Sequence, residues 1–520
     1  MNSSHPPHVD LQALAKQVMQ ARGFQPDFSP EVQKQLAEIK AHPPLAAASS
    51  GAGPGSNSPA GANPQTGSDP QTGSGVHVGS EVHIKDLRSL LWSSIDNDTS
   101  RDLDQIEVAE QLPNGDVKVM VGIADVDAFV PKATPIDVHA ARETTTVYTG
   151  VRMFPMLPED LSTGASSLLE NQDRLAVVTE FVVSADGNVN SGTVYRALVR
   201  NKAQLMYNSL GSWLEGTAAA PPKVAASTEL QAQLKLQNDA AQALKKQRFL
   251  HGALNIDTGE VHAVVLNQQV VDIAQQNRNR ATELIEDFMI AANGVVARLL
   301  RDVSSLRRIV KTPERWDRIV QLAAGYSVTL PAQPDSKALN DFLLKRKAAD
   351  PDHFADLSLA VIKLIGPGEY VLERPGDAEQ GHFGLAVQDY THSTAPNRRF
   401  ADVVTQRLIK AHLAGTPGPY SDAELESIAN NCTVKGDAAR KVERDMSKRL
   451  AAVAMSNRIG ETFDAIVTGV IPGGTFVRVM QPHIEGMLTE GAKGLDVGDS
   501  LRVKLVRTDV QRGYIDFVRA

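Results

Sequence analysis

The sequence predicts an α+β protein, in which a large mixed domain of strands and helices is followed by a small all-β barrel. Three observations support this fold class. Strand-like runs come first after residue 84, and helical patterns dominate later, up to about residue 415. Five short apolar runs separated by glycine turns fill residues 460–520. Apolar side chains recur at helical spacing in residues 9–41, which predicts a short helical N-terminal segment.

Composition changes divide the chain into four parts, which are residues 1–42, 43–82, 83–456 and 457–520. The first is the helical segment, which we expect to pack on the main domain; a small nucleic-acid-binding module is the alternative. The second is dominated by Gly, Ser, Pro, Ala, Asn and Thr. Such a segment buries too little apolar surface to offset its ordering entropy, so we expect a flexible linker. The third and fourth are the large domain and the barrel.

Periodicity places the elements of the large domain in order along the chain. Alternating or continuous apolar runs predict strands, and 3.6-residue spacing predicts helices. The expected strands are Val117–Ile123, Leu175–Val183 and Val194–Val199, and the expected helices are Arg280–Arg301, Ala401–Leu413 and residues 421–456. The expected strands of the barrel are Phe463–Val470, Gly474–Val479, Ile484–Leu488, Ser500–Val506 and Tyr514–Val518.

Bulk properties narrow the class of protein. No stretch approaches the ~18 apolar residues of a spanning helix, and the N-terminus lacks a secretion signal, so we expect a cytoplasmic protein without a membrane partner. The single cysteine, Cys432, excludes an internal disulfide and a cysteine-rich zinc site. The net charge of −8 argues weakly against nucleic acid, but an acidic average can conceal a local basic channel.

An acidic cluster is the densest chemical signal. Residues 95–105 read Ile-Asp-Asn-Asp-Thr-Ser-Arg-Asp-Leu-Asp-Gln, with aspartates at positions 96, 98, 102 and 104. Carboxylates forced together repel one another unless a cation neutralises them, and magnesium takes one or two of them with water and phosphate. A polar turn is the alternative interpretation. The segment does not match a calcium-binding EF loop: counted from Asp96, the twelfth position is Glu107, but the sixth is Arg101, where that loop needs glycine.

A basic cluster is the second signal. Residues 390–402 read Tyr-Thr-His-Ser-Thr-Ala-Pro-Asn-Arg-Arg-Phe-Ala-Asp. We expect Pro396 to break the chain, Asn397 to cap a helix, and Arg398 and Arg399 to stand at its start, where free N–H groups and guanidinium groups bind anions. Surface ion pairs of the two arginines with Asp402 and Glu443 are the alternative. A carboxylate cluster and an arginine cluster together are what phosphodiester hydrolysis requires.

Four segments in this order resemble the ribonuclease II/ribonuclease R family, whose catalytic unit is the RNB domain. In chain order they are the acidic cluster, Val121-Gly-Ile-Ala-Asp-Val126, Phe154-Pro-Met-Leu-Pro-Glu-Asp-Leu161, and the basic cluster. The resemblance covers about residues 85–449. It implies 3′-to-5′ hydrolysis of single-stranded RNA to nucleoside 5′-monophosphates, with RNA threaded through a channel to a magnesium site at its base.

The resemblance also assigns roles to residues. Asp96, Asp102 and Asp104 look like metal-binding and catalytic aspartates, and Arg398 looks like the arginine beside the scissile phosphate, with Arg399 sharing that role. The Tyr207 ring resembles an aromatic that clamps the terminal base, with a core tyrosine as the alternative. Glu286 resembles an acidic residue that contacts the terminal nucleotide, although its neighbour Asp287 competes for that assignment.

The chain departs from the family pattern at two places. The family pattern ends Asp-x-Asp-Asp, but here Gln105 occupies the last position, which is a metal-ligand position. We therefore expect weaker magnesium binding, or a preference for manganese, unless Asp98 compensates. Upstream of the RNB-like region, where close relatives carry paired cold-shock barrels, this sequence has about 42 residues and the linker.

Residues 460–520 resemble the S1-type OB domain, which binds single strands through aromatic and basic side chains. Phe476, His483 and Arg478 are the candidate contacts, and a barrel that serves as a scaffold is the alternative. The function predicted for the whole chain is a metal-dependent exoribonuclease. The alternative is a catalytically weak or inactive RNA-binding protein of the same fold, because Gln105 replaces an aspartate.

Overall fold

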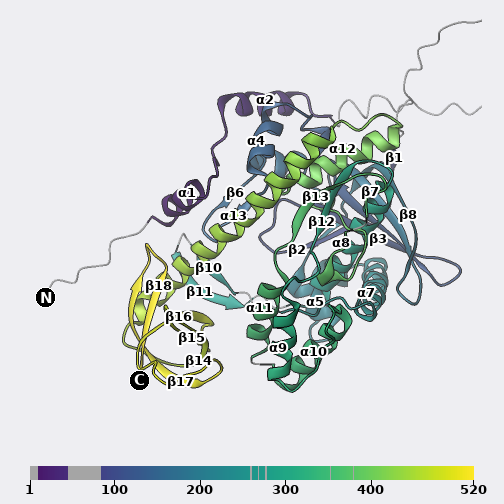
Figure 1. Cartoon of the computed structure of the whole chain (residues 1–520). Coiled ribbons are helices and arrows are strands. Elements are labelled where there is room, and N and C mark those ends of the chain that lie inside the picture. The colour runs from purple at the N-terminus through teal and green to yellow at the C-terminus, as the bar shows by residue number, and fades with distance from the viewer. Residues whose placement is uncertain are drawn as a thin grey trace, which may run out of the picture.

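The computed structural model of the chain describes residues 10–44, 84–257, 261–266, 269–275, 278–351, 353–378 and 380–520 (Figure 1). The linker expected at residues 43–82 lies almost wholly outside these residues. In the part of the chain that the structure describes, no helix has the length and apolar character that crossing a membrane requires.

A seven-stranded sheet forms the centre of the large domain. Its spatial order is β1, β8, β7, β4, β3, β2, β9, with parallel pairing at β1–β8 and β2–β9 and antiparallel pairing elsewhere. The strands are β1 (Lys85–Asp86), β2 (Ser93–Asp96), β3 (Gln105–Gln111), β4 (Val117–Ala124), β7 (Asp173–Val183), β8 (Val189–Arg200) and β9 (Ala203–Met206). The strands expected from periodicity are β4, β7 and part of β8.

Helices α5 (Tyr207–Leu214), α7 (Thr228–Leu250) and α8 (Arg280–Leu299) pack on the sheet and on one another. The ring of Phe288 on α8 meets Phe181 of β7 edge to face, with centroids 6.3 Å apart. Helix α12 (Phe400–Ala414) is buried along most of its length, and α13 (Asp422–Met455) runs from beside it toward the barrel (Figure 1). These helices enclose the main hydrophobic core with the sheet.

A helical unit that periodicity did not predict follows α8. Helices α9 (Trp316–Gly325), α10 (Ser336–Ala349) and α11 (Phe354–Ile365) bury their own apolar cluster, which includes Trp316, Phe342 and Phe354. The pair β12 (Ser305–Ile309) and β13 (Glu369–Glu373) joins this unit to the rest of the domain. The remaining elements are α4 (Pro135–Glu143), α6 (Pro222–Ala225), the hairpin β5 (Val147–Tyr148) with β6 (Met153–Phe154), the hairpin β10 (Val261–Leu266) with β11 (Gln269–Gln275), and short helical turns.

The two predicted N-terminal helices are present as α1 (Leu11–Ala21) and α2 (Pro30–Ala41). Each begins at a capping side chain, Asp10 and Ser29 respectively, which accepts hydrogen bonds from free backbone N–H groups. Helix α1 packs on α13, and α2 packs on α4. An ion pair of 2.7 Å between Arg22 and Asp445 ties the segment to α13. The segment therefore packs on the main domain, as expected.

The C-terminal unit is a closed five-stranded barrel in the order β14, β15, β16, β18, β17. Its strands are β14 (Thr462–Ile471), β15 (Gly474–Val479), β16 (Ile484–Glu490), β17 (Ser500–Asp509) and β18 (Tyr514–Arg519). Inward-facing Val477, Val503 and Phe517 fill it, and Ala452 and Met455 of α13 extend its core. The α+β fold class with a C-terminal barrel is confirmed.

One ion pair links the barrel to the helical unit. Arg478 of β15 donates to both carboxylate oxygens of Asp356 on α11, at 2.6 and 3.0 Å. Both side chains are less than one third exposed. The predicted RNA contact Arg478 is therefore engaged within the protein, where a two-pronged bond of this kind fixes orientation as well as distance.

Replacement of Arg478 by Ala is expected to loosen the barrel. A bidentate, partly buried pair contributes about 1–2 kcal/mol, which shifts the docked-to-undocked ratio by roughly 5–30-fold. Small-angle X-ray scattering of Arg478→Ala should therefore give a larger radius of gyration than wild type, whereas Lys504→Ala, at an exposed position of the barrel, should not. Scattering from Arg478→Ala that overlays that of wild type would contradict this expectation.

Candidate active site

The acidic cluster forms the loop between β2 and β3. Asp96 is the last residue of β2, and Gln105 is the first residue of β3. The Asp96 carboxylate accepts hydrogen bonds from the Asn97 backbone N–H (2.7 Å) and the Ser100 hydroxyl (2.8 Å), which shape the turn. Burial raises the pKa of Asp96, and these two bonds oppose that rise. The polar turn and the carboxylate site are thus the same feature.

Asp104 joins this loop to the basic cluster. One of its carboxylate oxygens accepts the Asn397 backbone N–H at 2.9 Å, and the other lies 3.5 Å from Nε of Arg398. Asp104 is buried, with 3% of its surface exposed, and this burial raises the pKa of its carboxyl to about 7 against the opposing effect of Arg398. Arg398 also acts electrostatically on Asp96. The two clusters that the sequence places about 300 residues apart therefore meet at one site.

Tyr148 is a site residue that sequence reasoning missed. It ends β5, and its hydroxyl donates to Asp102 at 3.0 Å. Burial raises the pKa of Tyr148, and the charge of Asp102 raises it further, so the phenol keeps its proton. The residue as a whole is 43% exposed, so it is accessible to a ligand. A tyrosine in a Thr-Thr-Val-Tyr run carries no sequence signal of this contact.

Arg398 and Arg399 have different surroundings. The guanidinium of Arg399 is held by the Asp402 carboxylate, with bonds of 2.9 and 2.7 Å; the ion pair of the alternative interpretation forms, but Asp402 is fully buried and not at the surface. The Arg398 side chain is 46% exposed and faces Asp104. Helix α12 starts at Phe400 with Arg399 as its N-cap, not with Asn397 as expected, because the side-chain oxygen of Asn397 accepts the Ser166 hydroxyl at 2.6 Å. Arg398 is therefore the arginine with a free face toward a ligand.

Tyr207 stands near the carboxylates. It is the first residue of α5, directly after β9, whose partner strand β2 ends at Asp96. Burial raises the pKa of Tyr207, and the charges of Asp96 and Glu107 add to that rise. The tyrosine is only half-buried, so it is not a closed core residue.

The α8 carboxylates separate into two environments. Asp287 is buried and paired with Arg248. Glu286 is half-buried and paired with the exposed Arg278. Glu286 is therefore the better placed of the two to meet a ligand.

Phe476, the candidate contact on the barrel, lies half-buried on the outer face of β15, and the barrel stands apart from β2 and its loop (Figure 1).

The donor set at this site suits a hard cation. All candidate ligands are oxygen atoms, and magnesium binds through one or two carboxylates plus water and phosphate. In the described ranges, no three Asp, Glu, His or Cys side chains form a ready-made metal cluster. Asp98 is exposed in the turn. Burial raises the pKa of Glu107, two residues further along β3, well above its ordinary value. The site therefore fits a cation held by few protein ligands.

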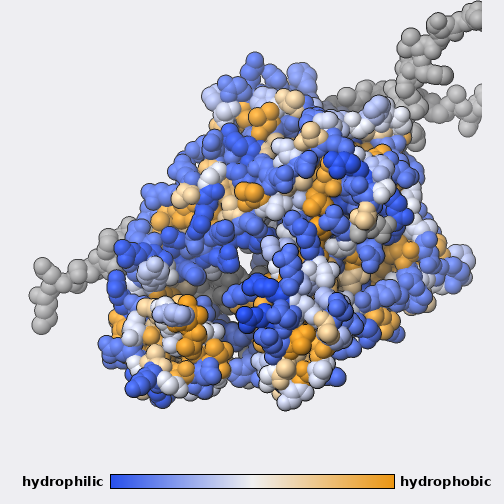
Figure 2. All heavy atoms as spheres, in the orientation of Figure 1, coloured by the Kyte–Doolittle hydropathy of each residue, from blue (hydrophilic) through white to orange (hydrophobic). Residues whose placement is uncertain are grey.

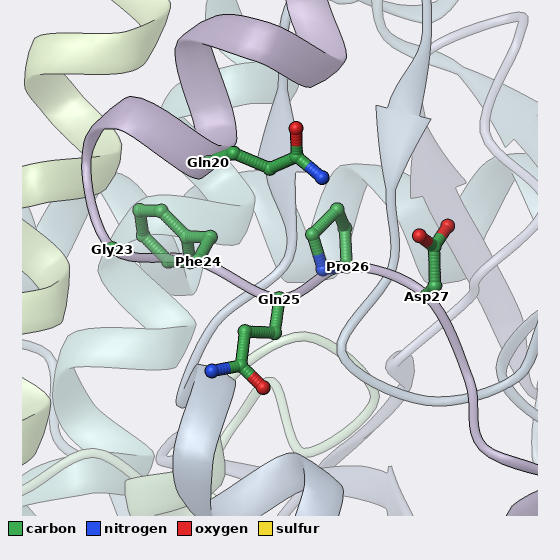
Figure 3. A pocket seen from close by; sticks show the side chains of 6 residues that line it. All are labelled: Gln20, Gly23, Phe24, Gln25, Pro26 and Asp27. Carbon is green, nitrogen blue, oxygen red and sulfur yellow. The ribbon is translucent and has the colours of Figure 1, made fainter.

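The other surface features of the described residues are weaker candidates for a functional site. The face in Figure 2 is largely hydrophilic, with apolar side chains in scattered patches. A shallow hollow of about 520 Å³ follows α1 and is lined by Gln20, Gly23, Phe24, Gln25, Pro26 and Asp27 (Figure 3). A second hollow, of about 790 Å³, lies between α2 and the start of α4. Neither contains a residue of the two clusters.

Comparison with known proteins points to one family. A model described as the RNB domain matches residues 84–415, and one described as the RNase II-type exonuclease C-terminal S1 domain matches residues 461–520. Ribonuclease R of Thermotoga maritima is 30% identical over 468 residues, which cover 84% of this chain and 64% of the relative. Ribonuclease R of Escherichia coli is 29% identical over 419 residues, which cover 78% and 51%. The chain thus spans about half to two thirds of these relatives.

Solved structures show the same fold. Mycoplasma genitalium RNase R in complex with ribose methylated single-stranded RNA superposes with a TM-score of 0.81 and 21% identity, over 98% of this chain and 78% of the other. Yeast Ssd1, a pseudonuclease, superposes with a TM-score of 0.63 and 18% identity, over 78% and 50%. At these identities the likeness establishes the fold alone.

Proposed function

The chain belongs to the RNB-domain family, and from this we propose that it is a hydrolytic exoribonuclease that shortens single-stranded RNA from the 3′ end to nucleoside 5′-monophosphates. One observation carries the proposal: the buried carboxylate of Asp104 is held between the Asn397 backbone N–H and Nε of Arg398. This contact joins a carboxylate loop to an exposed arginine, which are the two components that phosphodiester hydrolysis needs. The relatives named ribonuclease R support the same reaction.

Each residue of the candidate site has a separate proposed role in the reaction. Asp96 and the Gln105 carbonyl oxygen would hold magnesium, or manganese as the alternative, and a bound ion supplies Lewis-acid polarisation of phosphate and activation of water. Asp104 is placed to orient the attacking water and to accept its proton on the oxygen that faces Arg398. The exposed guanidinium of Arg398 is placed to stabilise the negative charge that develops on the phosphate.

The remaining residues bind and position the RNA. Tyr148 holds the Asp102 carboxylate through its hydroxyl, which fixes the loop. A base stacked on the Tyr207 ring gains about 1–3 kcal/mol regardless of its identity. Glu286 is placed to accept hydrogen bonds from the terminal nucleotide. Phe476 offers a stacking surface on the barrel. Arg399 contributes indirectly: its ion pair with Asp402 stabilises the segment that carries Arg398.

A catalytically weak RNA-binding protein is the second candidate. The observation in its favour is Gln105, which contributes no charge at a metal-ligand position. The fold is compatible with this function, because the solved structure of yeast Ssd1 is described as a pseudonuclease.

A labelling experiment separates the two candidates. Single-stranded RNA labelled at its 5′ end is incubated with the full chain in magnesium, and separately in manganese. A ladder of shortening products, together with immediate release of labelled mononucleotide from a 3′-labelled copy, supports 3′-to-5′ exonuclease activity. RNA that is retained on the protein but keeps its length with both metals supports the binding protein. Internal cleavage products would reject both.

The substitution Gln105→Asp is expected to lower the magnesium concentration that gives half-maximal activity by roughly 10-fold, because cation affinity follows the charge of the ligand set. Titration of RNA shortening against magnesium for the variant and wild type measures this shift. Gln105→Asn keeps the amide and serves as the control. An unchanged titration midpoint for Gln105→Asp would show that this position does not contribute to metal binding.

A further inference from the structure

Glu107 shares a strand face with Gln105. Side chains alternate along a strand, so residues two apart point to the same side of the sheet. Gln105 opens β3, and Glu107 follows two positions later, opposite Val121 of β4 and Ser93 of β2. Asp96 is the charged group that acts on the Glu107 carboxyl, and both act on the Tyr207 hydroxyl. Glu107 therefore stands near the carboxylate loop and on the face of its amide.

The Glu107 carboxylate is exceptional in being unpaired. Within the described ranges, six other buried Asp and Glu side chains each have a cationic partner. These pairs are Asp104 with Arg398, Asp125 with Lys410, Asp137 with Arg407, Glu143 with Arg142, Asp287 with Arg248, and Asp402 with Arg399. Glu107 has 0% exposure, and neither of its oxygens has a hydrogen-bond partner.

A buried carboxylate without a partner costs several kcal/mol, so each instance in a folded protein requires an explanation. The hydroxyl of Ser93, directly across from Glu107, is also buried without a partner. Within the described residues, the core thus holds two neighbouring polar groups without hydrogen-bond partners, on the strand that ends at Asp96 and the strand that begins at Gln105. A cation in the loop would supply the missing partner.

We propose that Glu107 provides a carboxylate ligand to the divalent cation, together with Asp96, and so supplies the charge that Gln105 lacks. This inference rests on the proposed function. Two carboxylates are the usual complement for magnesium, and they agree with the lack of a three-residue cluster in the described part of the chain.

Metal binding tests this inference without reference to catalysis. Manganese is titrated into the full chain in the presence of uridine 5′-monophosphate, and free manganese is followed by electron paramagnetic resonance. Glu107→Gln is expected to weaken manganese affinity by roughly 10-fold or more, as loss of a metal-site residue does. The matched control is Glu110→Gln, an exposed carboxylate on the same strand, which pairs with Lys118 and should leave affinity unchanged. Circular dichroism establishes that each variant is folded.

A second variant tests the exchange of roles between the two positions. In the Glu107→Gln background, Gln105→Asp is expected to restore manganese affinity to within about threefold of wild type, since ligand charge is again complete. Folded Glu107→Gln that binds manganese as tightly as wild type overturns the inference and leaves Glu107 as a protonated core residue bonded to Ser93. If the wild-type chain shortens RNA in the same preparation, that result leaves the proposed function intact. Wild type that binds manganese through Glu107 but never shortens RNA overturns the proposed function instead.

Discussion

Asp104→Asn is expected to reduce the rate of RNA shortening by about 10²–10⁴-fold, the range for loss of a positioned proton acceptor. The amide matches the carboxylate in shape, and its oxygen can still accept the Asn397 backbone N–H. It cannot accept the proton of the attacking water. Its NH₂ group would also face Nε of Arg398, which lies 3.5 Å from the carboxylate in wild type. The loss therefore arises at the reacting atoms and not from misfolding.

Single-turnover kinetics with excess enzyme measures this loss, and filter binding measures RNA affinity in parallel. Affinity is expected to stay at or above that of wild type, because a negative charge is removed beside the phosphate. Asp98→Asn is the matched control, since Asp98 is an exposed aspartate of the same loop. If Asp104→Asn turned over RNA within threefold of wild type, the assignment of Asp104 would be wrong.

Arg398→Ala is expected to slow turnover by about 10²–10³-fold, as removal of one preorganised donor to a developing charge does. Arg398→Lys is expected to recover part of the rate, because an ammonium group keeps the charge but not the two-pronged geometry. Both variants should still fold, with some loss of stability for Arg398→Ala, because nearly half of the Arg398 side chain is exposed but its partner Asp104 is buried. The variants are compared by single-turnover rate and by thermal unfolding.

Arg399→Ala provides the contrast. This arginine is held by Asp402, whose side chain is fully buried, so its removal leaves a buried charge unpaired and costs about 3–5 kcal/mol of stability. The melting temperature of Arg399→Ala should fall further than that of Arg398→Ala, because Asp104 keeps the Asn397 backbone N–H as a partner when Arg398 is removed. Equal loss of rate at unchanged stability in both variants would contradict the distinction between the two arginines.

Local periodicity was sufficient to predict elements whose apolar pattern is strong. Helices α8, α12 and α13 and all five barrel strands lie within a few residues of their expected ranges. The α9–α11 unit was not predicted, because its helices are short and their apolar faces meet only one another. The cap of α12 was placed two residues too early, since the side-chain oxygen of Asn397 accepts the hydroxyl of the distant Ser166. A contact of that range leaves no trace in local spacing.

The residues of the candidate site were also only partly predictable from the sequence. Residue type and resemblance were sufficient to name Asp96, Asp104 and Arg398, which the structure brings together. Tyr148 was missed, because its bond to Asp102 depends on how a two-stranded hairpin packs. Glu107 reads as an ordinary strand residue until burial and the lack of a partner are known. The roles of Arg398 and Arg399 are alike in sequence and differ only in exposure.

The bond between Asp104 and the Asn397 backbone spans 293 positions of the chain. During synthesis, therefore, the emerging polypeptide has a complete carboxylate loop long before it has anything to close against it. Under the proposed function, the nascent protein would therefore lack an assembled catalytic site until residue 397 has been synthesised.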